Sequence, residues 1–229
     1  MPAQILELIE KFDTFELVRD QIAAILAVES ANQEALALAA LPTPKDPRLW
    51  ALRVFIERTK PHSEFQDVET GDQLDATPIV NVWFDESIID LKRSNPVERQ
   101  MTEGTFNLDV YACGIAEKDG ATHIPGDERA ARELHRAVRL VRNIVMGGAY
   151  TYLGMRGVVA RRFVQSIKAF QPQIDDRAAQ RVQGARLTLR VDFNEFSPQV
   201  QGEPFESLHV TVKRKETGEV YFAAKYPEV

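Results

Sequence analysis

The sequence has only one cysteine, Cys113, in its 229 residues. A single thiol cannot close an intrachain disulfide, so we expect folding in a reducing compartment such as the cytoplasm. The chain also lacks an uninterrupted apolar run of about 18 residues, the length that a transmembrane helix requires. Its opening segment has neither a basic start nor a long apolar stretch, so no secretory signal is expected.

Residues that commonly carry chemistry are few and scattered. The four histidines lie at positions 62, 123, 135 and 209, too far apart along the chain to suggest a metal pair. Neighbouring acids such as Asp85 and Glu86 fall in an expected loop without a nearby histidine or cysteine, so surface solvation is their expected role. No recognisable motif places a base beside Cys113. We therefore expect no catalytic residues, no metal and no cofactor.

What the chain does contain is an uneven distribution of charge. The formal net charge is −6, yet residues 127–190 carry 13 Lys and Arg against 5 Asp and Glu. Residues 1–126 carry 11 basic against 22 acidic residues, and residues 191–229 carry 4 against 7. This separation of an acidic N-terminal part from a basic segment that follows it indicates a surface that contacts a charged partner.

The N-terminal part predicts a helical arm. Residues 3–40 are rich in helix formers, and Asp13 followed by Glu16 is a capping-box arrangement that begins a helical segment. Three prolines between Leu41 and Pro47 end the helix and form a stiff linker. We expect residues 1–45 to be an N-terminal helical arm and residues 46–229 to form the main body.

The main body predicts an α+β fold. Strands are expected at 49–58, 79–84, 104–115 and 185–193, and a C-terminal hairpin is expected around a turn at 216–218. The segment 158–170 fits either a strand or a helix, and 59–78 is expected to be a loop. Residues 85–101 are charged and contain Pro96, so an exposed loop or a poorly ordered hairpin tip is expected there.

The best helix of the main body covers residues 127–146, with Asp127 as its expected cap and Gly147-Gly148 as its stop. The expected architecture is a mixed or antiparallel β-sheet packed on this one main amphipathic helix, with an N-terminal helical extension.

One row of arginines follows this helix. Arg129, Arg132, Arg136 and Arg139 recur at i, i+3, i+7 and i+10, so they share the face opposite the apolar stripe. An ordinary solvated face gives the same pattern. Guanidinium forks also bind carboxylates and phosphates well, and we predict that the row is a subunit or partner interface. The alternative is a small nucleic-acid-binding module that uses the basic segment 127–190, although no aromatic residues interleave the row.

The order of segments carries a resemblance. An early strand, LWALRVFIER, is followed by a strand ending in GTFNLDVYACGI and by a single amphipathic helix, ERAARELHRAVRLVRNIVM. Strands then surround RRFVQSIKAF and GARLTLRVDF, and the chain closes with ESLHVTVKRKETGEVYFAAKY. From about residue 49 to 229 this order resembles the tail terminator (tail completion or neck ring) proteins of tailed bacteriophages. The closing segment resembles the C-terminal hairpin of contractile-tail members, whereas the arm 1–45 and the loops 59–78 and 85–103 depart from the smaller members.

The resemblance implies a virion structural protein without enzymatic activity or cofactors. Such a protein caps the finished tail tube as a ring, commonly a hexamer, and joins the tail to the head connector. Its implied partners are further copies of itself, the tail tube and sheath proteins and the head–tail connector protein. No membrane is implied, and nucleic acid only in the lumen of the ring. The implied location is the tail or neck of the virion, after assembly in the cytoplasm of the host bacterium.

Overall fold

The protein has a mixed α+β fold, as the sequence predicts, with a five-stranded mixed sheet and two α-helices. The computed structural model describes residues 12–65, 76–94, 99–114, 116–119, 122–172, 181–196, 208–213 and 220–226. The sheet and both helices belong to one compact unit, Ile9–Ser197, and the C-terminal hairpin belongs to a second unit. The chain therefore does not divide near residue 45, where the sequence predicts the end of an arm.

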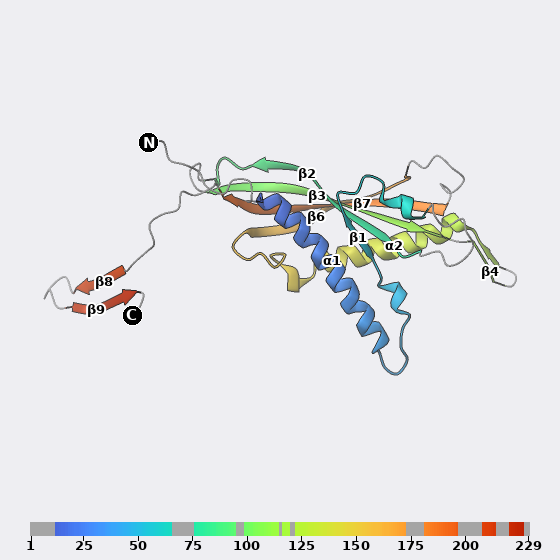
Figure 1. Ribbon diagram of the computed structural model, residues 1–229, viewed down its shortest axis with the longest axis horizontal. Coiled ribbons are helices and arrows are strands. Elements are labelled where there is room, and N and C mark those ends of the chain that lie inside the picture. The colour runs from blue at the N-terminus through green and yellow to red at the C-terminus, as the bar shows by residue number, and fades with distance from the viewer. Residues whose placement is uncertain are drawn as a thin grey trace. The chain divides into compact units, whose positions relative to one another are not determined.

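The strand order in the sheet is β1-β2-β3-β7-β6 (Figure 1). These strands are β1 (Arg53–Ile56), β2 (Ile79–Ile89), β3 (Arg99–Cys113), β7 (Val182–Phe196) and β6 (Val159–Phe170). β1 runs parallel to β2, and the other neighbouring pairs are antiparallel. Successive side chains of a strand point to opposite faces of the sheet. The apolar side chains of each central strand therefore lie on one face, and this face forms one side of the hydrophobic core.

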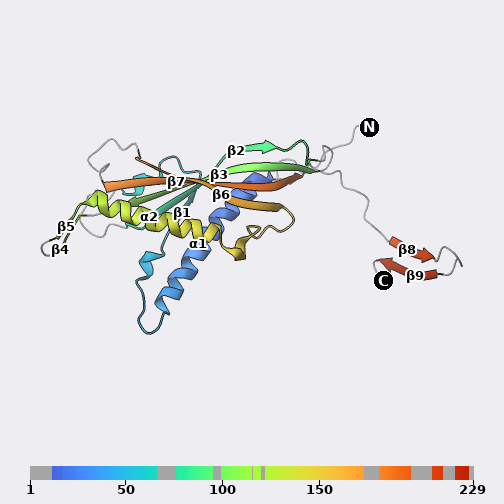
Figure 2. The same cartoon turned by 180° about the vertical axis from the view of Figure 1, so that it is seen from behind.

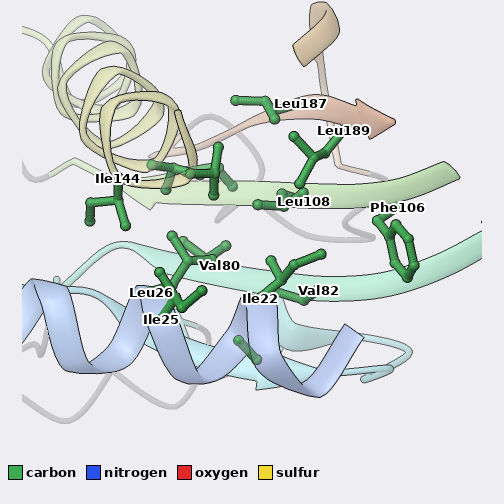
Figure 3. Close-up of a cluster of buried hydrophobic side chains, with 14 of the residues drawn as sticks. Ile22, Ile25, Leu26, Val80, Val82, Phe106, Leu108, Ile144, Leu187 and Leu189 are labelled. Carbon is green, nitrogen blue, oxygen red and sulfur yellow. The ribbon is translucent and has the colours of Figure 1, made fainter. Parts of the chain in front are cut away.

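α1 (Thr14–Leu38) begins at the predicted capping box, where the backbone N–H of Asp13 donates to the Glu16 carboxylate at 3.0 Å. Its apolar stripe is buried against the sheet, since Ile22 and Leu26 are both 0% exposed. Figure 3 shows these side chains facing β2 across the core. The helix is thus part of the main body and not an arm, because an apolar stripe of this kind must be buried against another element.

α2 (Gly126–Val145) packs on the same face of the sheet, and both views show the two helices on one side of it (Figures 1 and 2). Its buried residues join those of α1 and the sheet in one cluster. The sheet is consequently covered by two helices, where the sequence predicts one main helix. α1 contributes Val18, Ile22, Ala23, Ile25 and Leu26 to the core cluster that α2 and the sheet share.

Both ends of α2 are fixed by neighbouring segments. The predicted cap, Asp127, is wrong: the N-cap is Pro125, and the Asp127 side chain accepts from the Glu128 N–H at 2.9 Å within the first turn. At the other end, Arg162 of β6 donates to the carbonyl oxygen of Gly147 at 2.6 Å and also to that of Val145. This guanidinium satisfies carbonyls that the helix itself leaves without partners.

The start of α2 lies directly against the end of β3. A Cβ atom at Gly114 would lie 2.2 Å from the carbonyl oxygen of Gly126 and 2.3 Å from the nitrogen of Ala130. Only a residue without a side chain allows this approach, since both neighbours are backbone atoms. Gly114 therefore sets the distance between the sheet and the first turn of the helix.

The hairpin of β2 and β3 is longer than the sequence predicts. Residues 85–101 are expected to be an exposed loop or a hairpin tip; they belong to a hairpin, but β2 continues to Ile89 and β3 begins at Arg99. A register shift between Phe84 and Glu86 marks a β-bulge, after which the two strands keep pairing. The extra length was not predicted because the segment is charged, whereas the strand continues past the bulge through backbone pairing with β3.

The remaining elements are short. They are the 3₁₀ helices η1 (Pro47–Leu49), η2 (Pro61–Phe65) and η4 (Gly148–Tyr150), the ribbon β4 (Glu117–Asp119) with β5 (Thr122–Ile124), and the hairpin β8 (Leu208–Lys213) with β9 (Val220–Tyr226). The C-terminal hairpin was predicted, but its turn at 216–218 lies outside the described residues, as does the first predicted helical segment up to residue 11. The ambiguous segment 158–170 is a strand, β6.

Candidate functional site

The predicted arginine row lies on α2, but its first three members are paired within the chain. Arg132 forms an ion pair with Glu128, and Glu133 lies between Arg129 and Arg136, at 3.9 Å and 2.8 Å respectively. Pairs at i, i+3 and i, i+4 are the neighbours that helix geometry brings together. The N-terminal part of the row is therefore largely neutralised by its own helix.

Arg136 also joins α2 to the segment before the sheet. Its guanidinium donates to the carbonyl oxygen of Leu49 in η1, and its side chain is only 18% exposed. Removing it would leave the Leu49 carbonyl and the Glu133 carboxylate without this partner. Arg136 thus acts as a structural residue in this chain, which makes it a poor probe of docking.

Arg139 is the member of the row that keeps its charge available. It is exposed, as is the neighbouring Arg142, and in the described part of the chain neither forms an ion pair. Arg142 lies in the last turn, where a cation interacts favourably with the helix dipole. The free positive charge of α2 is thus concentrated at its C-terminal half.

The opposite face of the sheet carries a polar cluster that sequence analysis did not assemble. Asp109 of β3 is 4% exposed and accepts from Arg186 of β7 through both carboxylate oxygens, at 2.7 and 2.8 Å. The indole N–H of Trp83 on β2 donates to the same carboxylate at 3.2 Å. The Arg186 guanidinium lies 4.6 Å from the centroid of the Trp83 ring, a cation–π contact.

The same face, called here the polar face, continues toward β6 with further arginine pairs. Asp192 is 1% exposed and accepts from Arg161 at 2.7 Å and from Arg93 at 3.4 Å. Arg190 forms an ion pair with Glu103. Each of these carboxylates is thus held by an arginine, an arrangement that orders the side chains of this face.

The other end of the polar face is apolar. Phe65 of η2 covers a small cluster that includes Tyr111, Cys113 and Val182. Burial raises the pKa of the Cys113 thiol, which argues against a role as a nucleophile. Burial also lowers the pKa of His62, which lies 5.5 Å from Tyr111 between ring centroids. This cluster has the character of a small second core.

Because of Tyr111, the free energy of unfolding is expected to fall as the pH rises through the alkaline range. Burial, followed by the charge of Asp109, raises its pKa to about 12. The unfolded chain releases the phenolic proton near pH 10, so the stabilisation is complete below that pH and is lost as the pH rises toward 12. A two-unit shift corresponds to roughly 2 to 3 kcal/mol. Denaturant titrations of the natural protein and Tyr111→Phe should diverge over this range, and parallel curves would contradict the assignment.

No protein-family model matches the chain, and no curated protein sequence is significantly similar to it. Within the described ranges, no group of three or more His, Cys, Asp or Glu side chains is placed to hold a metal ion. The helices of the described part include none that is long and apolar enough to cross a membrane. What the protein does must be inferred from its surfaces.

The polar face had a signal in the sequence. The alternation in 104–115 separates Asn107, Asp109 and Tyr111 from the apolar side chains of the same strand. The partners of Asp109 are Trp83 and Arg186, which lie 26 and 77 residues away from it along the chain. Only the strand order brings these residues together, so local pattern predicts the polar side of each strand and not the ion pairs between strands.

Proposed function

We propose that this protein is a self-assembling virion component of a tailed bacteriophage, a tail terminator or closely related neck ring protein. It forms a ring that caps the tail tube and meets the head connector, and its main body is the corresponding α+β domain. The order of segments supports the proposal, including a C-terminal hairpin that belongs to a separate unit. A hairpin in a unit of its own suits a contact with a neighbouring tail protein.

The observation that carries the proposal is the free charge of Arg139 on α2. The opposite side of this helix is buried, so the exposed side is what a partner meets. The chain that bears this cation has a net charge of −6, with 22 acidic residues among its first 126. A second copy therefore offers a surface of matching sign, as does any acidic tube or sheath protein. Complementary charges across an interface fix the register of the two partners and disfavour association with partners of the wrong charge.

Arg139→Glu tests the proposal. The variant should keep the natural fold and stability to within about 0.5 kcal/mol, because the side chain is exposed and makes no ion pair among the described residues. Reversal of its charge should weaken assembly about tenfold. Light scattering would measure the size of the protein alone and mixed with a tail tube protein, and circular dichroism would confirm the fold.

Lys45→Glu is the matched control, because it makes the same charge change at an exposed position outside α2. It should assemble as the natural protein does. Equal assembly of Arg139→Glu would count against the row as an interface, and a clean monomer at high concentration would count against the ring. The nucleic-acid alternative stays a prediction: it requires binding to duplex DNA that weakens steeply with salt.

A further inference from the structure

Two carboxylates near the start of α1 are held by one arginine. Arg19 donates to Asp20 at 2.8 Å and to Glu57, which follows the end of β1, at 3.3 Å. The Arg19 side chain is only 18% exposed, whereas those of Asp20 and Glu57 are 52% and 43% exposed. The arginine is thus largely covered, and the two acids that it fixes are open to the solvent.

Each of these carboxylates keeps one oxygen free. Arg19 binds Oδ1 of Asp20, and Oε1 of Glu57 accepts from Arg19 and from the backbone N–H of Phe84, the latter at 3.1 Å. Oδ2 of Asp20 and Oε2 of Glu57 have no hydrogen-bond partner among the residues that the structure describes. Carboxylate oxygens held in fixed positions are good acceptors for a further guanidinium group.

The next residues of β2 extend this pair of acids into a patch. Asp85 and Glu86 directly follow Phe84, both are exposed, and neither forms an ion pair within the described ranges. We call the four residues Asp20, Glu57, Asp85 and Glu86 the acidic patch. Four acids together with Arg19 give it a formal charge of −3.

Other acids at the surface of the described part of the chain are mostly neutralised by their own arginines. These ion pairs are Asp46 with Arg48, Glu64 with Arg58, Glu103 with Arg190 and Glu128 with Arg132. The acidic patch differs from them because it contains more carboxylates than its single arginine can neutralise. It is therefore the surface of this chain that best fits a cationic partner.

We propose that the acidic patch of one copy binds the C-terminal half of α2 on a second copy, where Arg139 and Arg142 are exposed. Neither arginine forms an ion pair in the part of the chain that the structure describes. This inference deepens the proposed function by naming the surface that Arg139 contacts. It rests on that function for the closed ring, but not for the contact itself.

The two surfaces match in spacing and in charge. Arg139 and Arg142 are three positions apart on a helix, so their side chains are neighbours on one face. Asp20 and Glu57 are neighbours too, because one guanidinium contacts both of them. Two added cations change the formal charge of the acidic patch from −3 to −1.

Each surface also exposes an apolar side chain beside its charges. Met146, one turn after Arg142, is 41% exposed, and Leu17, one turn before Asp20, is 44% exposed. Residues three or four positions apart on a helix share a face, so each apolar side chain lies next to its charged neighbour. Apolar contacts of this kind exclude water from adjacent charge pairs, which strengthens them.

The contact is heterologous, because the acidic patch and the C-terminal half of α2 are different surfaces of the chain. Each copy offers one surface to each of two neighbours, and such a contact closes into a ring when its rotation allows closure. Two acidic patches repel one another, as do two basic helix ends. Pairing of like surfaces about a two-fold axis is therefore disfavoured.

A charge exchange tests the contact in the full-length protein. Asp20→Arg should weaken self-association about tenfold, as Arg139→Glu does, because each change places like charges across the contact. The double variant Asp20→Arg with Arg139→Glu again has opposite charges there, and its self-association should return to within about threefold of the natural protein. Light scattering over a series of protein concentrations at low salt measures the association.

Glu34→Arg is the matched control. It makes the same charge change on the same helix, about four turns beyond Asp20, at a residue without an ion pair among those described. It should self-associate as the natural protein does, and combining it with Arg139→Glu should give no recovery. Asp20→Asn removes the charge without reversing it and should weaken self-association about threefold. Circular dichroism verifies that each variant is folded.

The outcomes separate this inference from the proposed function. Natural self-association of Asp20→Arg, no recovery in its double variant with Arg139→Glu, or equal recovery through Glu34→Arg would overturn the contact. Mixing with a tail tube protein tests the proposed function separately. Rings that cap a tail tube without recovery by charge exchange would leave the proposed function standing and remove this contact. Recovery in a protein that ignores the tail tube protein would do the reverse.

Discussion

Replacing Leu26 with alanine should lower the free energy of unfolding by roughly 3 to 4 kcal/mol. Leu26 is 0% exposed and lies in the cluster that α1, α2 and the sheet share (Figure 3). The loss combines the transfer of the missing methyl groups with a cavity that close-packed neighbours fill only in part. Denaturant unfolding followed by circular dichroism measures the change, provided that the slope of the transition is unaltered.

Leu36→Ala is the control on the same helix, because Leu36 is 62% exposed. It removes the same atoms and should change the free energy of unfolding by no more than about 0.5 kcal/mol. If the two variants were equally stable, α1 would not belong to the core, and the separate arm expected from the sequence would be correct. A large difference also means that deleting residues 1–45 unfolds the main body.

Replacing Arg186 with methionine should cost roughly 2 to 4 kcal/mol of stability. The change leaves the Asp109 carboxylate, whose side chain is 6% exposed, without its bidentate partner. The expected loss stays below that of a fully buried pair, because the Arg186 side chain is 39% exposed and solvent screens it. Thermal and denaturant unfolding at neutral pH measure the effect.

The double variant Asp109→Asn with Arg186→Met shows whether the stranded charge causes this loss. A neutral amide oxygen still accepts from the Trp83 indole, so the double variant should recover most of the stability. Double-mutant arithmetic then yields the coupling between the two side chains. If Asp109→Asn gave no recovery, the loss would come from the packing of Arg186 on Trp83 and not from charge.

Local pattern predicted the elements with strong periodicity. The capping box of Asp13 and Glu16 begins α1, and the apolar stripe of 127–146 is α2 to within one residue at each end. The alternation in 104–115 is the core of β3. These succeed because a cap or a stripe depends on residues within a few positions of one another.

Features that depend on distant residues were missed or placed wrongly. The Pro-rich stretch after residue 40 suggested a boundary, yet α1 packs on β2, which lies beyond it in the chain. The charge and the proline within 85–101 indicated a loop or a hairpin tip, yet β2 continues past its bulge to Ile89 by pairing with β3. The spacing of the arginines places them in one row on α2, but it does not predict the contact of Arg136 with Leu49, which joins residues 87 positions apart. Each of these outcomes depends on contacts between residues that lie far apart along the chain.

The sequence by itself determined the α+β class, the two amphipathic helices, the apolar and polar side of each central strand, and the separation of acidic and basic segments. These properties follow from composition and from periods of 2 and 3.6 residues, which are local. Only the tertiary structure decided that α1 belongs to the core, that Asp109 is bound by Arg186, and that β1 and β6 lie at the two ends of the sheet. Strand order and register bring these residues together across long stretches of chain, and no local pattern encodes that order.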